Sequence, residues 1–236
     1  TSIAYEDFVD GYEKDFLHTA YAKGLRITRE LLDDDMYYVI SKRTKALARS
    51  ARIRKEYDHG LLFQNASATT YFTGQDGLEL LSASHTYAGK AGVWSNYAGA
   101  VDLSLSALET GFAAIRRYTD DTGNLINLEP ATLLIPPELE MDAFEILKSS
   151  GKPYTADNEA NWMQGRLNVI TWANITDADR WFLLVDDKSL WPVSFDRTPL
   201  EFDNDGDFDT KDLKVSAYTR YSNGFFDPRM CYGSIG

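Results

Sequence analysis

The segment between residues 33 and 60 constrains the fold more than any other part of the chain. Apolar or small side chains recur in it at spacings of three and four, which predicts a helix with a narrow apolar stripe: Tyr37, Ile40, Thr44, Leu47 and Ala51. Asp33, Asp34 and Asp35 would lie in the first turn, and Gly60 would end the helix. Such a helix has about 24 residues and a length of about 36 Å. Only one side of it can be buried by its own chain.

The same segment carries the clearest charge feature of the sequence. It contains seven basic residues and no acidic one between its first and last member: Lys42, Arg43, Lys45, Arg49, Arg52, Arg54 and Lys55. The whole chain has 24 Lys and Arg against 36 Asp and Glu, a net charge of −12. This acidity argues against a protein that binds nucleic acid sequence-specifically. Because some of the basic residues lie two positions apart, we expect them on three or more faces of the helix, unable to serve one contact together.

Flanking patterns predict a mixed architecture. Residues 14–28 have strand character, interrupted by Gly24. Residues 64–100, rich in small and polar side chains, predict loops and short strands. Leucine and aromatic spacing predicts a second helix over residues 104–118, and Ser106 and Glu109 have the spacing of a capping box.

The second half of the chain predicts further strands and one helix. Residues 132–135 form a short buried strand, and Pro136-Pro137 then opens a helix whose buried face is Leu139, Ala143, Phe144 and Leu147. Strands follow at residues 167–175 and 181–185, the latter apolar enough to be central in a sheet. The tail from residue 199 again alternates as strands do. The fold class is therefore α+β, with a long helix and two sheet regions.

No pattern calls for catalysis, a cofactor or a metal. The three histidines, His18, His59 and His85, lie in different elements without metal-ligand spacing, and Cys231 is interpreted as a packing residue. Nucleotide-binding and hydrolase motifs are absent from the sequence. Asp203–Asp209 departs from a calcium loop and is expected to be a solvated turn. No apolar run approaches the roughly 18 residues of a membrane span.

Four stretches in order resemble the major capsid proteins of tailed bacteriophages, most closely the Mu-type major head subunits. The first runs from His18 to Asp35 and is similar to the return strand of the family's extended loop with the entry to its long spine helix. The others are residues 76–85 followed by 94–96, residues 133–140, and residues 181–185. The resemblance covers the chain from about Lys14 onward. The family's N-terminal arm and outgoing loop strand are mostly missing, so we expect that maturation removed them or that the sequence is partial.

The resemblance implies the tailed-phage major capsid fold, with a spine helix, a peripheral domain, an axial domain and an extended loop. It places the N-terminal segment and the return strand at residues 1–33, the spine helix and peripheral domain at 34–97, the axial domain at 98–187, and the return to the peripheral domain at 188–236. It implies self-assembly as hexamers and pentamers into an icosahedral head around double-stranded DNA, in the bacterial host cytoplasm. Portal, decoration and scaffold proteins are implied partners; a membrane is not.

Two sets of residues are candidates for contacts in such a shell. Tyr12, Phe16, Tyr21 and Lys23 lie in an early extended segment without obvious intramolecular cover, so we expect them to touch a neighbouring subunit. The seven basic residues form a solvated face with pairing to carboxylates, or some of them face the packaged DNA. Two other functions stay open: an encapsulin-type compartment shell, which shares the fold, and a soluble enzyme, which would need a polar pocket that the sequence does not indicate.

Overall fold

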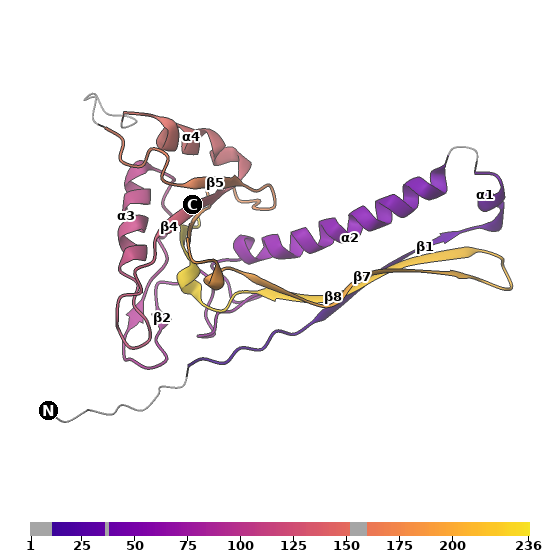
Figure 1. The fold of residues 1–236 in the computed structure, drawn as a ribbon, viewed down its shortest axis with the longest axis horizontal. Helices are drawn as coiled ribbons and strands as arrows, with labels where there is room; N and C mark the ends of the chain where they lie inside the picture. Colours follow the sequence, from indigo (N-terminus) through magenta and orange to yellow (C-terminus); the bar gives the residue numbers. More distant parts are fainter. Residues whose placement is uncertain (1–10, 36–37, 152–159) are drawn as a thin grey trace. The chain divides into compact units, whose positions relative to one another are not determined.

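A computed structural model describes residues 11–35, 38–151 and 160–236 (Figure 1). The chain divides into two compact units. One comprises residues 15–59 and 193–224 and is called the helix–sheet unit. The other comprises residues 1–14, 60–192 and 225–236 and is called the double-core unit. Helices and sheets are both present, which confirms the α+β fold class.

The helix–sheet unit is one long helix beside a three-stranded antiparallel sheet (Figure 1). The sheet has the order β1-β8-β7, with β1 at Thr19–Ile27, β7 at Val193–Gly206 and β8 at Leu213–Gly224. β1 pairs with β8 without interruption from Thr19↔Tyr221 to Ile27↔Leu213. β7 pairs along the other edge of β8, with register shifts between Asp196 and Glu201. The short helix α1, Arg29–Asp33, leads to α2, Val39–Gln64.

The predicted long helix is confirmed, with different ends. The carboxylate of Asp35 lies ahead of α2 and accepts the N–H groups of Val39 at 2.8 Å and Ile40 at 3.2 Å, so it caps the helix. Asp33 ends α1 instead of opening the long helix. Gly60 does not end α2: an added Cβ there would lie 2.8 Å from the Cβ of Asn174, so the glycine permits a close contact within a continuing helix.

The double-core unit is built on the mixed sheet β5-β4-β6-β9. Its strands are β4 at Pro130–Ile135, β5 at Asn168–Thr171, β6 at Trp181–Val185 and β9 at Cys231–Ser234. A two-stranded sheet is formed by β2, His85–Thr86, and β3, Val93–Trp94. The unit also contains two α-helices, α3 at Leu105–Arg116 and α4 at Glu140–Lys148. Its 3₁₀ turns are η1 at Pro137–Leu139, η2 at Lys188–Leu190 and η3 at Pro228–Met230.

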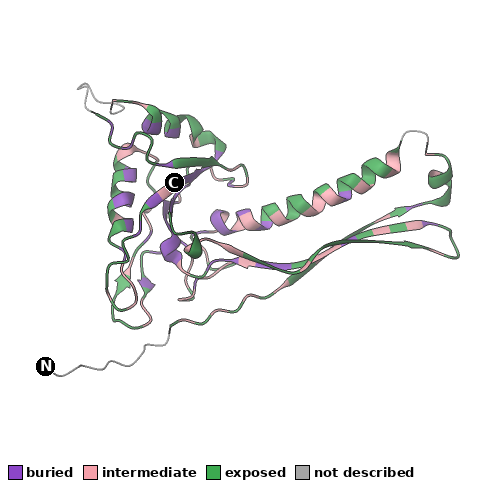
Figure 2. Ribbon diagram, in the orientation of Figure 1, coloured by how far each residue is buried: buried purple, intermediate pink, exposed green. Residues whose placement is uncertain are grey.

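Strand β6 explains why this unit has two cores. All five of its residues are buried (Figure 2). Because side chains alternate along a strand, Trp181, Leu183 and Val185 enter a core formed with α3 and α4. Phe182 and Leu184 enter a second core on the other face, with Phe63 among its members. The prediction that residues 181–185 are central in a sheet is confirmed.

Several local predictions were wrong for identifiable reasons. β1 continues through Gly24, which pairs with Ser216. The cap of α3 is Ser104, whose Oγ accepts the Ala107 N–H at 3.2 Å, so no capping box forms from Ser106. The buried face of α4 consists of Ala143, Ile146 and Leu147, whereas Phe144 is exposed, so the predicted place of Phe144 on this face was wrong.

Two strand boundaries also differ from expectation. The strand expected at residues 167–175 is reduced to β5, Asn168–Thr171, at the edge of its sheet. The expected turn at Asp203–Asp209 begins later, because Asp203 to Gly206 still belong to β7 and pair with β8. The carboxylate of Asp207 then organises the turn by accepting the N–H groups of Asp209 and Thr210.

The packing of α3 provides a stability test. A Cβ added to Gly111 would lie 2.6 Å from Leu183 Cδ1 and 2.9 Å from Tyr232 Cδ1. Helix propensity alone favours Val over Gly, so only packing can make Gly111→Val unfavourable. We expect a loss of about 1–3 kcal/mol in the free energy of unfolding, measured by urea denaturation. Gly206→Val, where an added Cβ meets nothing within 4 Å, is the control. Equal effects of the two changes would contradict the packing argument.

Candidate assembly surface

The inner face of the helix–sheet unit is held together by a buried carboxylate. Asp58 of α2 is 4% exposed. Its Oδ2 accepts the hydroxyl of Tyr221 at 2.6 Å, and Arg54 pairs with its Oδ1 at 2.8 Å. The backbone carbonyl of Asp58 accepts the side-chain amide of Asn223 at 2.9 Å. These bonds fix the rotation of α2 over β8, and with it which side of the helix faces outward.

Aromatic rings extend this contact across the sheet. Tyr21 of β1 stacks on Tyr221 with ring centroids 5.1 Å apart. The guanidinium of Arg54 lies over Tyr21 at 5.0 Å, within the range of a cation–π contact. Burial, together with the bond to Asp58, raises the pKa of Tyr221 well above its usual value. Both tyrosines are therefore neutral at physiological pH.

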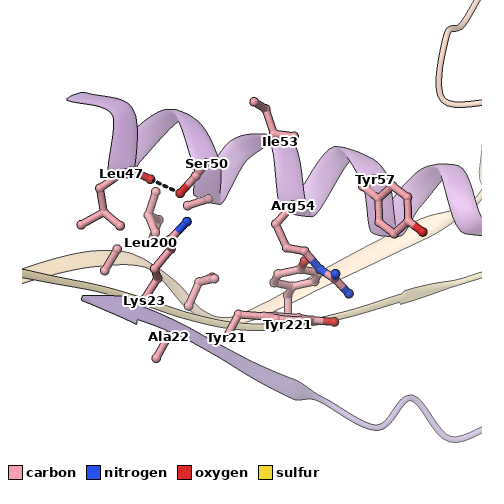
Figure 3. A pocket seen from close by; sticks show the side chains of 13 residues that line it. Tyr21, Ala22, Lys23, Leu47, Ser50, Ile53, Arg54, Tyr57, Leu200 and Tyr221 are labelled. Carbon is pink, nitrogen blue, oxygen red and sulfur yellow. Dashed lines mark hydrogen bonds between the residues drawn. The ribbon is translucent and has the colours of Figure 1, made fainter. Parts of the chain in front are cut away.

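Farther along the helix the contact with the sheet opens into a groove of about 670 Å³. Figure 3 shows α2 above and the strands below it, with Leu47, Ile53 and Leu200 among the labelled side chains. Ile53 is 53% exposed and Leu200 is 40% exposed. The helix–sheet unit thus leaves apolar surface uncovered beside the Asp58 contact, as expected for a helix that its own chain can bury on one side only.

The structure places the candidate contact residues in contacts that the sequence did not reveal. The hydroxyl of Tyr12 lies 2.8 Å from Thr86 Oγ1, and the ring of Phe16 packs edge-on against Phe195 at 5.3 Å. Tyr21 stacks as described above, and Lys23 is exposed at the groove. The argument that the aromatic residues lack intramolecular cover was therefore wrong, because their partners in β2, β7 and β8 come from distant parts of the chain. Contact of these four residues with a neighbouring subunit stays a prediction.

The basic residues of α2 separate into two groups. Arg54 pairs with Asp58, and Lys55 pairs with Asp196 of β7 at 2.6 Å. The other five are exposed and form no ion pair with any residue that the structure describes: Lys42, Arg43, Lys45, Arg49 and Arg52. Among the residues that the structure describes, pairing to the chain's own carboxylates therefore accounts for two of the seven.

The double-core unit contains one buried acid–base pair that sequence spacing did not reveal. Asp76 Oδ2 lies 2.6 Å from His85 Nδ1, and the two side chains are 2% and 0% exposed. The amide group of Asn96 donates to two backbone carbonyls, so its Oδ1 accepts from the Ser82 N–H and from His85 Nε2 at 3.1 Å. The ring of His85 therefore has both of its nitrogens engaged by partners within the unit, Asp76 and Asn96. It has no free nitrogen to offer a substrate.

Other chemically notable groups have structural surroundings. Cys231 is fully buried in the second core, and burial raises the pKa of its thiol, which keeps it protonated and unreactive. Its interpretation as a packing residue is confirmed. Across the described ranges, no three His, Cys, Asp or Glu side chains come together as metal ligands would. Nor does any helix in those ranges have the length and apolar character needed to cross a bilayer.

Solved structures of phage capsids and of an encapsulin share the fold of this chain. The capsid of Myoviridae phage XM1 is similar with a TM-score of 0.56 at 13% identity, over 94% of this chain and 74% of that chain. A phage-related protein from Bordetella bronchiseptica RB50 has a TM-score of 0.55 at 13% identity, over 98% and 77%. The holo-SrpI encapsulin complex from Synechococcus elongatus PCC 7942 has a TM-score of 0.56 at 10% identity, over 93% and 74%.

Sequence comparison then gives the family. The profile of the phage capsid protein family matches residues 13–234. The chain therefore belongs to the phage capsid protein family, and it is a structural protein of the virion shell. No curated protein matches it significantly. The tailed-phage capsid fold expected from the sequence is confirmed, whereas the finer likeness to Mu-type head subunits stays a prediction.

The contact of Asp58 with Tyr221 can be tested by substitution. Asp58→Ala leaves a buried tyrosine hydroxyl without an acceptor and removes the anion beside Arg54. We expect a loss of about 1–3 kcal/mol in the free energy of unfolding. Tyr221→Phe keeps the ring and removes the hydroxyl, so a double-mutant cycle isolates the hydrogen bond. Strict additivity of the two changes would show that the two groups do not interact.

The buried ion pair predicts a pH dependence of stability. Burial alone would raise the pKa of Asp76, but the hydrogen bond and charge of His85 outweigh it and hold this pKa below its usual value. A depressed pKa contributes stability above the unfolded-state pKa of about 3.9, which is lost as the pH falls through the folded-state value. We expect Asp76→Asn to cost about 2 kcal/mol at neutral pH and progressively less below about pH 4.

Chemical denaturation across this pH range measures the effect. Asp102→Asn, which changes an exposed carboxylate, is the matched control and is expected to alter stability little at any pH. A penalty for Asp76→Asn that stays constant from neutral to acidic pH would contradict the proposed charge pairing.

Proposed function

We propose that this capsid protein assembles as hexamers and pentamers into an icosahedral head that encloses double-stranded DNA, without enzymatic activity or a bound cofactor. The observation that carries the proposal is the match of the phage capsid family over residues 13–234, nearly the whole chain. A long helix buried on one side only is consistent with a protein completed by its neighbours. The partly exposed Ile53 and Leu200 give such neighbours an apolar surface to cover.

The proposed division into domains follows the resemblance described above. Residues 34–97 would provide the spine helix and peripheral domain, 98–187 the axial domain, and 188–236 the return to the peripheral domain. The long α2, together with strands contributed from both ends of the described chain, supports a peripheral role for the helix–sheet unit. The doubly buried β6 supports an independently packed axial region, since both of its faces are covered within one unit.

Subunit contact through β1 is proposed in a revised form. One edge of β1 is already paired with β8, and among the described residues its other edge has no partner strand. A strand from a neighbouring subunit could add there, with Tyr21 and Lys23 close to the junction and Tyr12 and Phe16 just before it. Packaged DNA, the portal, and decoration or scaffold proteins remain proposed partners, and the bacterial host cytoplasm the proposed place of assembly.

An encapsulin-type compartment is the second candidate, favoured by one specific observation. The SrpI encapsulin is as similar in fold as the XM1 capsid, with a TM-score of 0.56 for both. Fold likeness therefore does not separate a genome container from a protein container. The family match favours the phage head, because it concerns the sequence itself.

Assembly and contents provide the test. We expect the purified chain to form capsomers or closed shells, seen by negative-stain microscopy and sedimentation. Particles isolated from phage-producing cells are expected to contain double-stranded DNA. A stable monomer of 26.6 kDa at high concentration would contradict self-assembly by this chain. Shells that hold a folded enzyme and no nucleic acid would favour the encapsulin alternative.

A further inference from the structure

The outward face of α2 carries a row of unpaired positive charge. Lys42, Lys45, Arg49 and Arg52 follow one another at spacings of three, four and three, which places them along one side of the helix. We call these four residues the basic stripe. All four are exposed, and within the described ranges none pairs with an acidic side chain. The stripe is about 15 Å long.

The middle of the basic stripe lies on the side of α2 away from the sheet of its own unit, and Arg52, at one end of the stripe, also borders a depression beside β7. Leu47 and Asp58 are buried on the side of α2 that contacts the sheet. At about 100° per residue, the middle of the stripe is about 180° from Leu47. Arg43 is also exposed and unpaired but lies about 140° from the middle of the stripe, so it is a natural control.

The opposite face of the sheet carries a matching row of negative charge. Glu201, Asp203 and Asp205 occupy alternate positions of β7 and pair with Tyr218, Ser216 and Lys214 of β8. Residues 217, 219 and 221 of β8 line the groove beneath α2. Their alternate neighbours therefore face away from the helix. We call these three carboxylates the acidic row; they are exposed and span about 13 Å.

The surroundings of the acidic row favour a close approach. A depression of about 310 Å³ on this face is lined by Asp203 and Asp205, and also by the small residues Gly24 and Ser216. Two cations on this face are already neutralised: Arg26 pairs with Asp212 at 2.5 Å, and Lys214 pairs with Asp207 at 2.7 Å. A third, Arg220, lies opposite Thr198, beyond the Glu201 end of the acidic row. Among the residues that the structure describes, none of the three carboxylates of the acidic row forms an ion pair, so the row can accept cations from outside the unit.

We propose that the basic stripe of one subunit docks on the acidic row of a second copy of this chain. The inference rests on the proposed self-assembly. Within one helix–sheet unit the two surfaces face in opposite directions, so a copy cannot satisfy its own charges. The rows have similar lengths and opposite signs. Because each copy presents both surfaces once, the contact is heterologous and can close into rings.

Charge balance favours a second copy over nucleic acid as the occupant. A subunit with a net charge of −12 repels its neighbours unless opposite charges meet at their contacts. Docking on the acidic row pairs both unpaired surfaces at once. If the basic stripe bound DNA instead, the carboxylates of the acidic row would receive no counter-charge from a neighbouring copy. Complementary charges of this kind chiefly set register and partner choice.

Charge exchange tests the proposal. Arg49→Glu with Arg52→Glu reverses half of the stripe, and Asp203→Lys with Asp205→Lys reverses most of the row. We expect either pair of changes to raise the protein concentration needed for assembly about tenfold or more at about 0.15 M salt, measured by light scattering and sedimentation. The fourfold variant should return to within about threefold of the parent chain. Arg43→Glu should leave assembly unchanged, and circular dichroism should show a folded protein in each case.

Failure of the fourfold variant to recover while every variant stays folded would overturn the proposal. Reversed-stripe subunits that build normal shells but retain less nucleic acid would also overturn it, and would assign the stripe to DNA. Failure of the parent chain to assemble at all concerns the proposed function instead.

If the parent chain does not assemble, cross-linking still tests the docking contact. Arg49→Cys in one population and Asp203→Cys in another place single exposed thiols on the two surfaces, because the only native cysteine, Cys231, is buried. Mixing them under mild oxidation should give mixed disulfide dimers in preference to dimers of either population. Absence of that preference would overturn the docking contact whether or not shells form.

Discussion

The helix–sheet unit is shaped by one constraint: its own sheet can bury only one side of the long helix α2. α2 has 26 residues, and the sheet beneath it covers one side. Asp58 decides which side that is, since its bonds to Tyr221 and Arg54 hold the helix in one rotation. The exposed side, the open groove and the unpaired cations all follow from this single orientation. A capsid protein can tolerate such exposure if, as proposed, neighbouring subunits cover this surface.

Periodicity predicted the elements whose burial is local and regular. α2 shows spacings of three and four, and β6 is a continuous apolar run that proved central in its sheet. Glycines misled the prediction, because a glycine can end an element or allow another segment to approach closely. Gly60 allows Asn174 to approach α2 closely, and β1 continues through Gly24 without interruption. Pattern alone does not distinguish these uses, since the partner segment lies far away in sequence.

The candidate site was less predictable than the fold. The pairing of β1 with β8 joins residues almost 200 positions apart, so the cover of Phe16 and Tyr21 was not visible in the sequence. The basic stripe, in contrast, could have been found. Pairs of basic residues two positions apart predicted charges on three or more faces of the helix. Spacings of three and four nevertheless place four of the seven on one face. The buried pair of Asp76 and His85 gave no periodic signal at all.

The edge strand β7 bears on how copies of this chain can associate at all. β7 has 14 residues, and no described strand pairs with its outer edge; such an edge is a template on which identical strands could stack without limit, as in a fibril. Pro199 lacks an N–H group, the register shifts between Asp196 and Glu201 distort the edge, and like charges at alternate positions would repel in a stacked arrangement. Unlimited lateral growth through backbone pairing is thereby disfavoured. At this edge of the sheet, contacts between copies are left to side chains, which do not template an endless stack.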